Sequence, residues 1–257
     1  NPTVQPEESE GYNFGIIVKP VEGLKIYADY YEIEITDTIS TIGSQLILNG
    51  CYRENNQKYC GLVDRLSTGY VKDLRNTVNN IGMVETTGFE LATVYDWSDE
   101  LGNWRFSTEI AFLDTYDVTK ADGSIEHYAG YVTGNGRDQF KEVKGNLGLL
   151  WSQNEWAVSL TGQYHGEVDG VPGTVPKTSA AGVFISGDDP RTLAATWYWD
   201  AQASYVWEAI NSTIAVGVDN LLDEDPPYFP DSFANDFDPS YRTWGSQFWY
   251  VRISTQY

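Results

Sequence analysis

Alternation of apolar and polar residues, repeated nine times along the chain, is the feature that most constrains its fold. In the clearest case Trp156, Val158 and Leu160 share one face of an extended segment, while Ser159 and Thr161 lie on the other. A period of two residues is typical of a β-strand with one apolar face. The predicted strands are 12–19, 24–36, 83–97, 103–116, 144–152, 155–165, 196–208, 211–220 and 249–257. No segment has the pattern of a helix of three turns, so we expect an all-β, antiparallel meander.

The connections between these strands alternate strictly between short and long. Short connections lie at 20–23, 98–102, 153–154 and 209–210, and long ones at 37–82, 117–143, 166–195 and 221–245. This alternation places tight turns at one end of the sheet and large loops at the other, as in a transmembrane β-barrel with short periplasmic turns. Tryptophans flank the short turns, as in an interfacial aromatic girdle: Trp97, Trp104, Trp151, Trp156 and Trp207. The alternative is a soluble β-sandwich that buries these rings in its core.

Composition excludes several classes of protein. The chain has 16 Lys and Arg against 37 Asp and Glu, a net charge of -21, which argues against nucleic-acid binding. An aromatic content of 14% is too high for a disordered chain. No apolar run is long enough, about 18 residues, for a transmembrane helix. Negative loops would repel anionic ligands, so the charge favours a neutral oligosaccharide or a cationic complex as ligand.

The first residue is Asn1, and no initiator Met or signal peptide precedes the first strand. Nine strands leave two open sheet edges, and lipid offers no hydrogen-bond partners to such edges. We therefore expect the remaining strands of a barrel to come from sequence upstream of residue 1.

Two cysteines, Cys51 and Cys60, lie in a polar segment. They favour a disulfide that closes a small loop in an oxidising compartment. A metal site would need further ligands, and the only histidines, His127 and His165, are distant in sequence. Free thiols are the remaining alternative.

Five segments together resemble the TonB-dependent receptors of the bacterial outer membrane. They are NPTVQPEES at 1–9, DYYEIEI at 29–35, CYRENNQKYC at 51–60, NIGMVETTGFEL at 80–91 and VDNLLDEDPP at 218–227. Each segment is weak evidence alone, but their order and spacing are specific, and the resemblance runs from end to end. Segment 51–60 is similar to a subgroup in which a disulfide staples an extracellular loop.

The resemblance implies a roughly 22-stranded barrel closed by a plug, of which residues 1–257 would form the last nine strands and four outer loops. It implies a Gram-negative outer-membrane receptor that takes up a scarce nutrient, such as a siderophore or an oligosaccharide. Energy would come through TonB, by way of a plug and a TonB box that are absent from these residues. It implies no bond chemistry, no cofactor and no resident metal.

Two sets of site residues follow. Candidate ligand-contacting aromatics of the loops are Tyr128, Tyr131, Tyr228, Phe229, Phe233 and Trp244, although such rings also pack loops together. The candidate assembly signal of the last strand consists of Trp249, Val251, Ile253 and the terminal Tyr257, where the family usually has Phe.

Four other functions compete with this interpretation. The acidic segment 219–238 offers oxygen ligands for calcium, but its spacing does not match a calcium loop such as the EF-hand, so a solvated acidic loop is favoured. A hydrolytic triad is disfavoured because nothing in the sequence positions His127 or His165 beside a nucleophile. The alternative classes are a secreted soluble all-β carbohydrate-binding module and a porin without a plug.

Overall fold

The computed structural model describes residues 4–132, 139–170, 192–228, 237, 240–241 and 246–255. Candidate residues Phe229, Phe233, Trp244 and Tyr257 lie outside this part of the chain. Two compact units divide the chain. The first comprises Asn1–Tyr12, Glu32–Thr87 and Thr115–His127, and the second comprises Asn13–Tyr31, Gly88–Asp114 and Tyr128–Tyr257.

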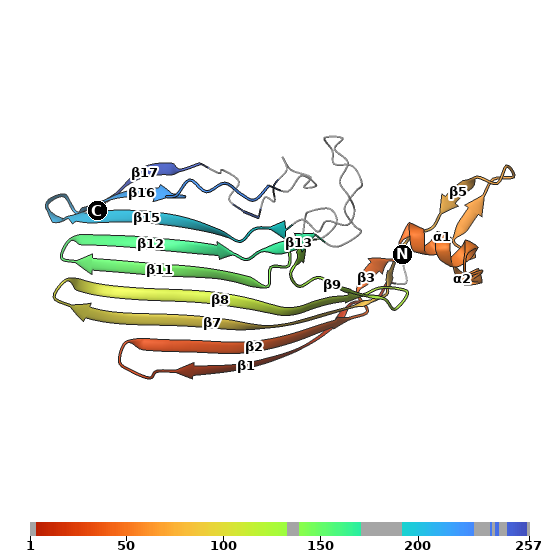
Figure 1. The fold of residues 1–257 in the computed structure, drawn as a ribbon, viewed down its shortest axis with the longest axis horizontal. Coiled ribbons are helices and arrows are strands. Elements are labelled where there is room, and N and C mark those ends of the chain that lie inside the picture. The colour runs from red at the N-terminus through yellow and green to blue at the C-terminus, as the bar shows by residue number, and fades with distance from the viewer. Residues whose placement is uncertain are drawn as a thin grey trace. The chain divides into compact units, whose positions relative to one another are not determined.

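The principal sheet is a meander in which each long strand pairs with the next long strand (Figure 1). Its order is β1-β2-β7-β8-β11-β12-β15-β16-β17, and β9 (Ile125–His127) pairs with β8 off this path. The bounds are β1 Glu8–Val18, β2 Leu24–Thr36, β7 Met83–Asp99, β8 Gly102–Thr119, β11 Val143–Gln153, β12 Trp156–His165, β15 Thr196–Trp207, β16 Ser212–Asp219 and β17 Phe248–Thr255. The predicted all-β meander is confirmed.

The registers show how the alternating pattern builds two different faces. One row across neighbouring strands is apolar throughout: Phe106, Leu149, Leu160, Ala201, Val218 and Trp249. The adjacent row on the opposite face is small or polar: Ser107, Gly148, Thr161 and Asp200. We call these the apolar face and the polar face of the sheet. A one-residue shift of register would exchange them, so the period-two pattern fixes the pairing.

Aromatic rings gather beside the short turns, as the sequence predicts. Trp97 stacks on Trp104 with ring centroids 5.8 Å apart, and Trp104 lies 6.3 Å from Trp151. Trp151 Nε1 donates a hydrogen bond to the Leu101 carbonyl oxygen in the turn between β7 and β8 (2.7 Å). Indoles with one polar atom and a large apolar surface suit a boundary between water and an apolar medium.

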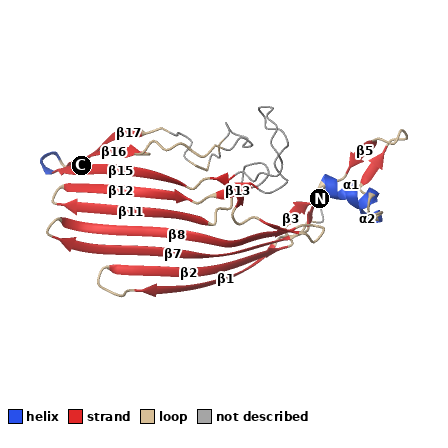
Figure 2. Cartoon of the chain, viewed as in Figure 1, coloured by secondary structure: helices blue, strands red, loops and turns tan. Residues whose placement is uncertain are grey.

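The connection predicted at 37–82 contains helices that the sequence analysis did not predict (Figure 2). It consists of β3 (Ile39–Thr41), α1 (Ser44–Tyr52), α2 (Gln57–Cys60), β4 (Val63–Arg65), β5 (Val71–Leu74) and β6 (Val78–Asn80). Helices of 9 and 4 residues are too short to show a recurring apolar stripe. None of the helices in the described ranges is long and apolar enough to cross a membrane.

Short elements complete the second unit. They are β10 (Tyr131–Val132), β13 (Val168–Gly170), β14 (Thr192–Leu193) and the 3₁₀ helix η1 (Glu208–Ile210). β13 pairs in parallel with β10 and antiparallel with β14. Val132, Val168 and Leu193 form a small buried core within these strands.

Candidate functional site

The polar face of the principal sheet contains two adjoining hollows. The first, of about 400 Å³, is lined on this face by Ser107, Glu109, Asn146, Gly148, Thr161, Gln163 and Asp200. The second, of about 420 Å³, shares Glu109 and Asn146 and adds Glu90, Ala92, Ala111 and Lys144. Three carboxylates and one ammonium group therefore line a continuous polar surface. Such a surface suits contact with water or with a polar ligand.

Next to these hollows, toward the long connections, an aromatic and cationic cluster covers the polar face. Tyr198 is 0% exposed, and its ring meets the His165 ring edge-on at 5.8 Å. The ring of Tyr241 lies 4.7 Å from His165 and 4.2 Å from the Nζ atom of Lys141. Lys141 is only 4% exposed, and the aromatic ring offsets part of the cost of burying its charge. Sequence analysis missed this cluster because its members come from distant strands and loops.

The candidate loop aromatics do not form a single group within the described residues. Tyr128 packs against Phe140 with ring centroids 5.3 Å apart, and Tyr131 lies half-buried in β10. Packing of loop segments therefore accounts for Tyr128. Tyr228 is 72% exposed and remains available to a ligand. Ligand contact by these residues stays a prediction.

Asn220, at the end of β16, organises the start of the acidic segment. Its backbone N–H donates to Asp200 Oδ1 (2.8 Å). Its side-chain Nδ2 donates to the Glu224 carbonyl oxygen (2.9 Å), and its Oδ1 accepts from the Glu224 N–H (3.0 Å). Asn220 is buried and has a positive φ of 55°, which asparagine tolerates better than most residues. In the described part of segment 219–238, the side chains of Asp200 and Asn220 therefore stabilise the turn that follows β16. Among all described residues, no group of three or more His, Cys, Asp or Glu could hold a metal ion.

We predict that replacing Asn220 by alanine destabilises the fold by about 2–4 kcal/mol. The change removes two side-chain hydrogen bonds. It also places alanine at a positive φ, where it lacks the local side-chain hydrogen bonds that let asparagine adopt this conformation. Asn220→Gly removes the same bonds without the backbone strain, so it should cost about 1 kcal/mol less. Denaturant unfolding of the refolded full-length protein measures both changes. A wild-type midpoint for Asn220→Ala, or a greater loss for glycine than for alanine, would contradict this assignment.

The outer hairpin of β8 and β9 contains two charged pairs. His127 Nδ1 lies 2.8 Å from Asp117 Oδ1, and Lys120 pairs with Glu126. In the turn between them, hydrogen bonds from the Ser124 hydroxyl and backbone N–H hold the pKa of Asp122 below its ordinary value. His127 thus belongs to an exposed hairpin pair, and Asp122 stabilises the turn.

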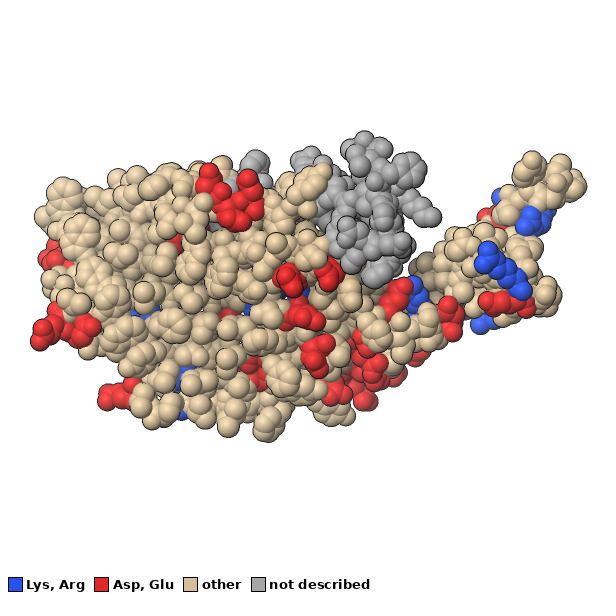
Figure 3. Space-filling model, viewed as in Figure 1, with Lys and Arg blue, Asp and Glu red and all other residues tan. Residues whose placement is uncertain are grey.

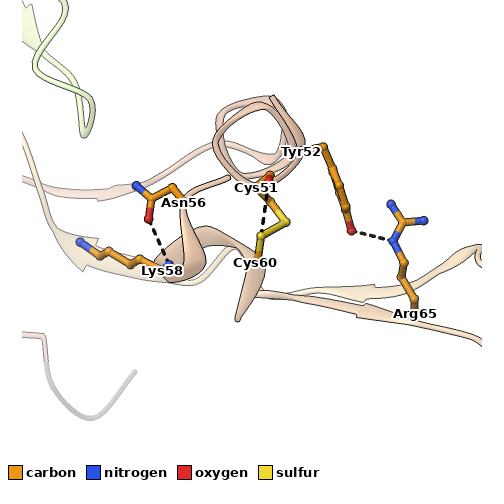
Figure 4. Close-up of a disulfide and its surroundings, with 6 residues drawn as sticks. All are labelled: Cys51, Tyr52, Asn56, Lys58, Cys60 and Arg65. Atoms are coloured by element: carbon orange, nitrogen blue, oxygen red, sulfur yellow. Dashed lines mark hydrogen bonds between the residues drawn. A yellow bond between two sulfur atoms is a disulfide. The ribbon is translucent and has the colours of Figure 1, made fainter. Parts of the chain in front are cut away.

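In the first unit, Cys51 and Cys60 form a disulfide with an Sγ–Sγ distance of 2.13 Å, which confirms the predicted pair (Figure 4). The disulfide joins α1 to α2. Asn56 caps the start of α2 by accepting a hydrogen bond from the Lys58 N–H (3.1 Å). A side chain at Gly50 would collide with the Tyr59 ring, since its Cβ would lie 2.1 Å from Cδ2. The two helices are therefore clamped together by a covalent bond and by close packing.

We predict that the double variant Cys51→Ser, Cys60→Ser lowers the stability of this segment by about 2–3 kcal/mol, because it releases the constraint on a loop of about ten residues. Limited proteolysis followed by mass spectrometry should detect faster cleavage within residues 43–76. Reduction of the wild-type protein should have the same effect, and reduction of the variant should have none. Equal cleavage rates for both proteins would show that the helices hold without the disulfide.

The last strand contains three residues of the candidate assembly signal. Trp249, Val251 and Ile253 lie on one face of β17 and are exposed. On the other face, the Tyr250 ring covers Gly217 of β16, and its hydroxyl donates to Gln202 Oε1 (3.2 Å). The terminal strand thus has one exposed apolar face, and Tyr250 on its other face packs against β16. Recognition of these residues by an assembly machine stays a prediction.

Comparison with known proteins adds independent information. The family model described as "TonB dependent receptor-like, beta-barrel" matches residues 1–221. No curated protein sequence matches the chain.

Solved structures match the fold at low sequence identity. A variant of the ferric enterobactin receptor PfeA of Pseudomonas aeruginosa has 16% identity and a TM-score of 0.61, covering 100% of this chain and 32% of that one. The iron transporter FrpB of Neisseria meningitidis has 10% identity and a TM-score of 0.60, covering 99% and 32%. The siderophore receptor PirA of Acinetobacter baumannii has 13% identity and a TM-score of 0.60, covering 98% and 32%. The chain therefore spans about a third of the length of these receptors.

Proposed function

Because the chain belongs to the TonB-dependent receptor β-barrel family, we propose that it forms part of the wall and outer loops of a transporter for a scarce nutrient. The protein is an outer-membrane protein. Residues 1–257 constitute the C-terminal part of the barrel, and sequence upstream supplies the other strands, the plug and the contact with TonB. The ligand is a siderophore, an oligosaccharide or a similar small molecule.

The observation that carries this proposal is the difference between the two faces of the principal sheet. The apolar face, with its row from Phe106 to Trp249, suits lipid. The polar face, with its hollows and with Glu90, Glu109 and Asp200, suits a lumen that contains water or a plug. A soluble sandwich would instead bury one face in a dry core.

The long connections at the end opposite the short turns are the proposed ligand-binding region. Tyr228 and the aromatic residues of the same connection, Phe229, Phe233 and Trp244, are proposed contacts, together with Tyr128 and Tyr131. Each ring offers an apolar face to a sugar or a planar chelate. The proposed role involves binding and transport, and no covalent step.

Solved proteins of similar fold include a ferric enterobactin receptor, an iron transporter and a siderophore receptor. Their names support an iron chelate as one ligand class. The excess of acidic residues supports a neutral or cationic ligand. The uptake experiment should therefore include iron chelates as well as neutral and cationic ligands.

Uptake by cells that express the intact gene product tests the proposal. Uptake of the correct labelled ligand should saturate and should stop when TonB is deleted or the proton-motive force is dissipated. Passive, unsaturable uptake with constant conductance in planar bilayers would instead indicate a porin. Release of the mature protein without detergent would indicate a secreted binding module and would refute the membrane role.

A further inference from the structure

Residues 43–76 form a small module with its own fold, which we call the disulfide module. At its base the Gly43 N–H donates to Asn76 Oδ1 (3.0 Å). Below this bond β3 and β6 form an antiparallel stalk in which Thr41 pairs with Val78. Inside the module Ile47 of α1 is 0% exposed. Cys51 follows it four residues later in α1 and forms the disulfide with Cys60 of α2. The module is thus an insertion whose two ends meet at a two-stranded stalk.

The charge of the disulfide module differs from that of the whole chain. It contains five Lys or Arg and three Asp or Glu, a net charge of +2, whereas the chain carries -21. Its cations are all exposed: Arg53, Lys58, Arg65, Lys72 and Arg75. Figure 3 shows blue Lys and Arg side chains gathered over the α1, α2 and β5 region on the visible face. The module is therefore a cationic surface on an acidic protein.

Few of these cations are neutralised within the module. Arg75 forms one ion pair, with Asp64 at 3.7 Å. Among the residues that the structure describes, Arg53, Lys58 and Lys72 form no ion pair. Three ammonium or guanidinium groups are therefore available to anions from solution.

Aromatic rings lie beside the cations of the disulfide module. Arg65 Nε donates to the Tyr52 hydroxyl (2.6 Å), and its Cζ lies 4.5 Å from the centre of the Tyr52 ring (Figure 4). Arg65 also donates to the Gly69 carbonyl oxygen. These bonds hold a guanidinium fork in one orientation next to an aromatic ring. Tyr70, at the tip of the hairpin of β4 and β5, is 76% exposed and lies two residues from Lys72.

We propose that the disulfide module is a docking surface for an anionic polysaccharide that carries carboxylates. Guanidinium groups bind carboxylates through paired hydrogen bonds, and exposed tyrosine rings offer flat apolar surfaces to sugar rings. Each exposed charge contact contributes less than about 1 kcal/mol, so a small anion at a single cation would bind weakly. A repeating polyanion contacts several cations at once and gains affinity by multivalency.

This inference goes beyond the proposed transport function and depends on it only for the exposure of the module at the cell surface. It also differs from the ligand preference that the overall acidic charge indicates. The docked polymer is a separate partner from the transported molecule. Binding by purified protein and uptake by cells are therefore separate measurements, and each can fail without the other.

The test measures binding of polygalacturonate to the purified full-length protein in detergent, with neutral dextran as the reference polymer. We expect Lys58→Gln with Lys72→Gln to weaken polygalacturonate binding about tenfold and to reduce its salt dependence. The matched control is Lys19→Gln with Lys25→Gln, which removes two exposed lysines of the second unit. This control should bind as the wild type does.

A second variant replaces residues 43–76 by Asn-Gly, which favours a tight turn at the end of the β3–β6 stalk. It should lose polygalacturonate binding while reaching the outer membrane at the wild-type level. Equal binding of dextran and polygalacturonate, equal losses in the two lysine pairs, or retained binding after excision would overturn the inference. Stronger binding to anionic lipid vesicles than to polygalacturonate would also overturn it, in favour of a lipid partner.

Discussion

Replacing Leu160 by lysine should destabilise the folded protein in a lipid bilayer by about 2–4 kcal/mol. Leu160 lies in the apolar row of the principal sheet, between Leu149 and Ala201. If this face contacts lipid, the ammonium group must leave water or distort the bilayer around it. Urea unfolding of the full-length protein in large vesicles, followed by tryptophan fluorescence, measures the change.

The adjacent position provides the matched control. Thr161 lies on the opposite face, in the row that contains Gly148 and Asp200, and lines a hollow. Thr161→Lys should therefore change the stability by less than about 1 kcal/mol, because its charge reaches water and lies near an aspartate. Equal effects of the two substitutions would contradict the assignment of lipid and lumen faces. A larger loss for Thr161→Lys would reverse that assignment.

Replacing Tyr198 by alanine should have a comparable effect, about 3–5 kcal/mol. The ring is fully buried against His165, in the cluster that also contains Tyr241 and Lys141. Its removal leaves a cavity below the long connections and loosens the cover over the polar face. Denaturant unfolding reports the loss of stability, and proteolysis reports exposure of the neighbouring loops.

Tyr198→Phe separates the ring from its hydroxyl. Because phenylalanine fills almost the same volume and keeps the ring against His165, this variant should lose less than about 1.5 kcal/mol. If phenylalanine is as destabilising as alanine, polar contacts hold the cluster together. If neither variant differs from wild type, Tyr198 is not a packing centre.

The strands were predictable because their signal is local. A strand with one apolar face repeats every two residues, and β2 begins and ends where the sequence pattern predicts, at Leu24 and Thr36. The predicted end of β8, at residue 116, was less accurate. In the structure this strand continues to Thr119, which pairs with Ile125 of β9. Hydrogen bonding to β9 therefore extends β8 beyond the residues that alternate between apolar and polar.

The candidate site was predictable only in part. The disulfide pair was predictable because the chain contains only two cysteines and two distant histidines. The two helices that the disulfide joins were not predictable. They are held by burial of Ile47 and by close packing of Gly50 against the Tyr59 ring, and neither contact produces a repeating sequence pattern. The cluster of Tyr198, His165 and Tyr241 depends on the pairing of strands with loops far apart in sequence.

The sequence by itself determined the number and alternation of the principal strands, their two contrasting faces and the family, because all of these are encoded in residue order. Only the tertiary structure decided which side chains are buried and which are exposed. The five cations of residues 43–76 are already close together in sequence, and the structure shows that all five are exposed. Folding buries Asn220, Lys141 and Tyr198. Side-chain environments depend on which residues the folded chain brings together, and that information is absent from any single segment.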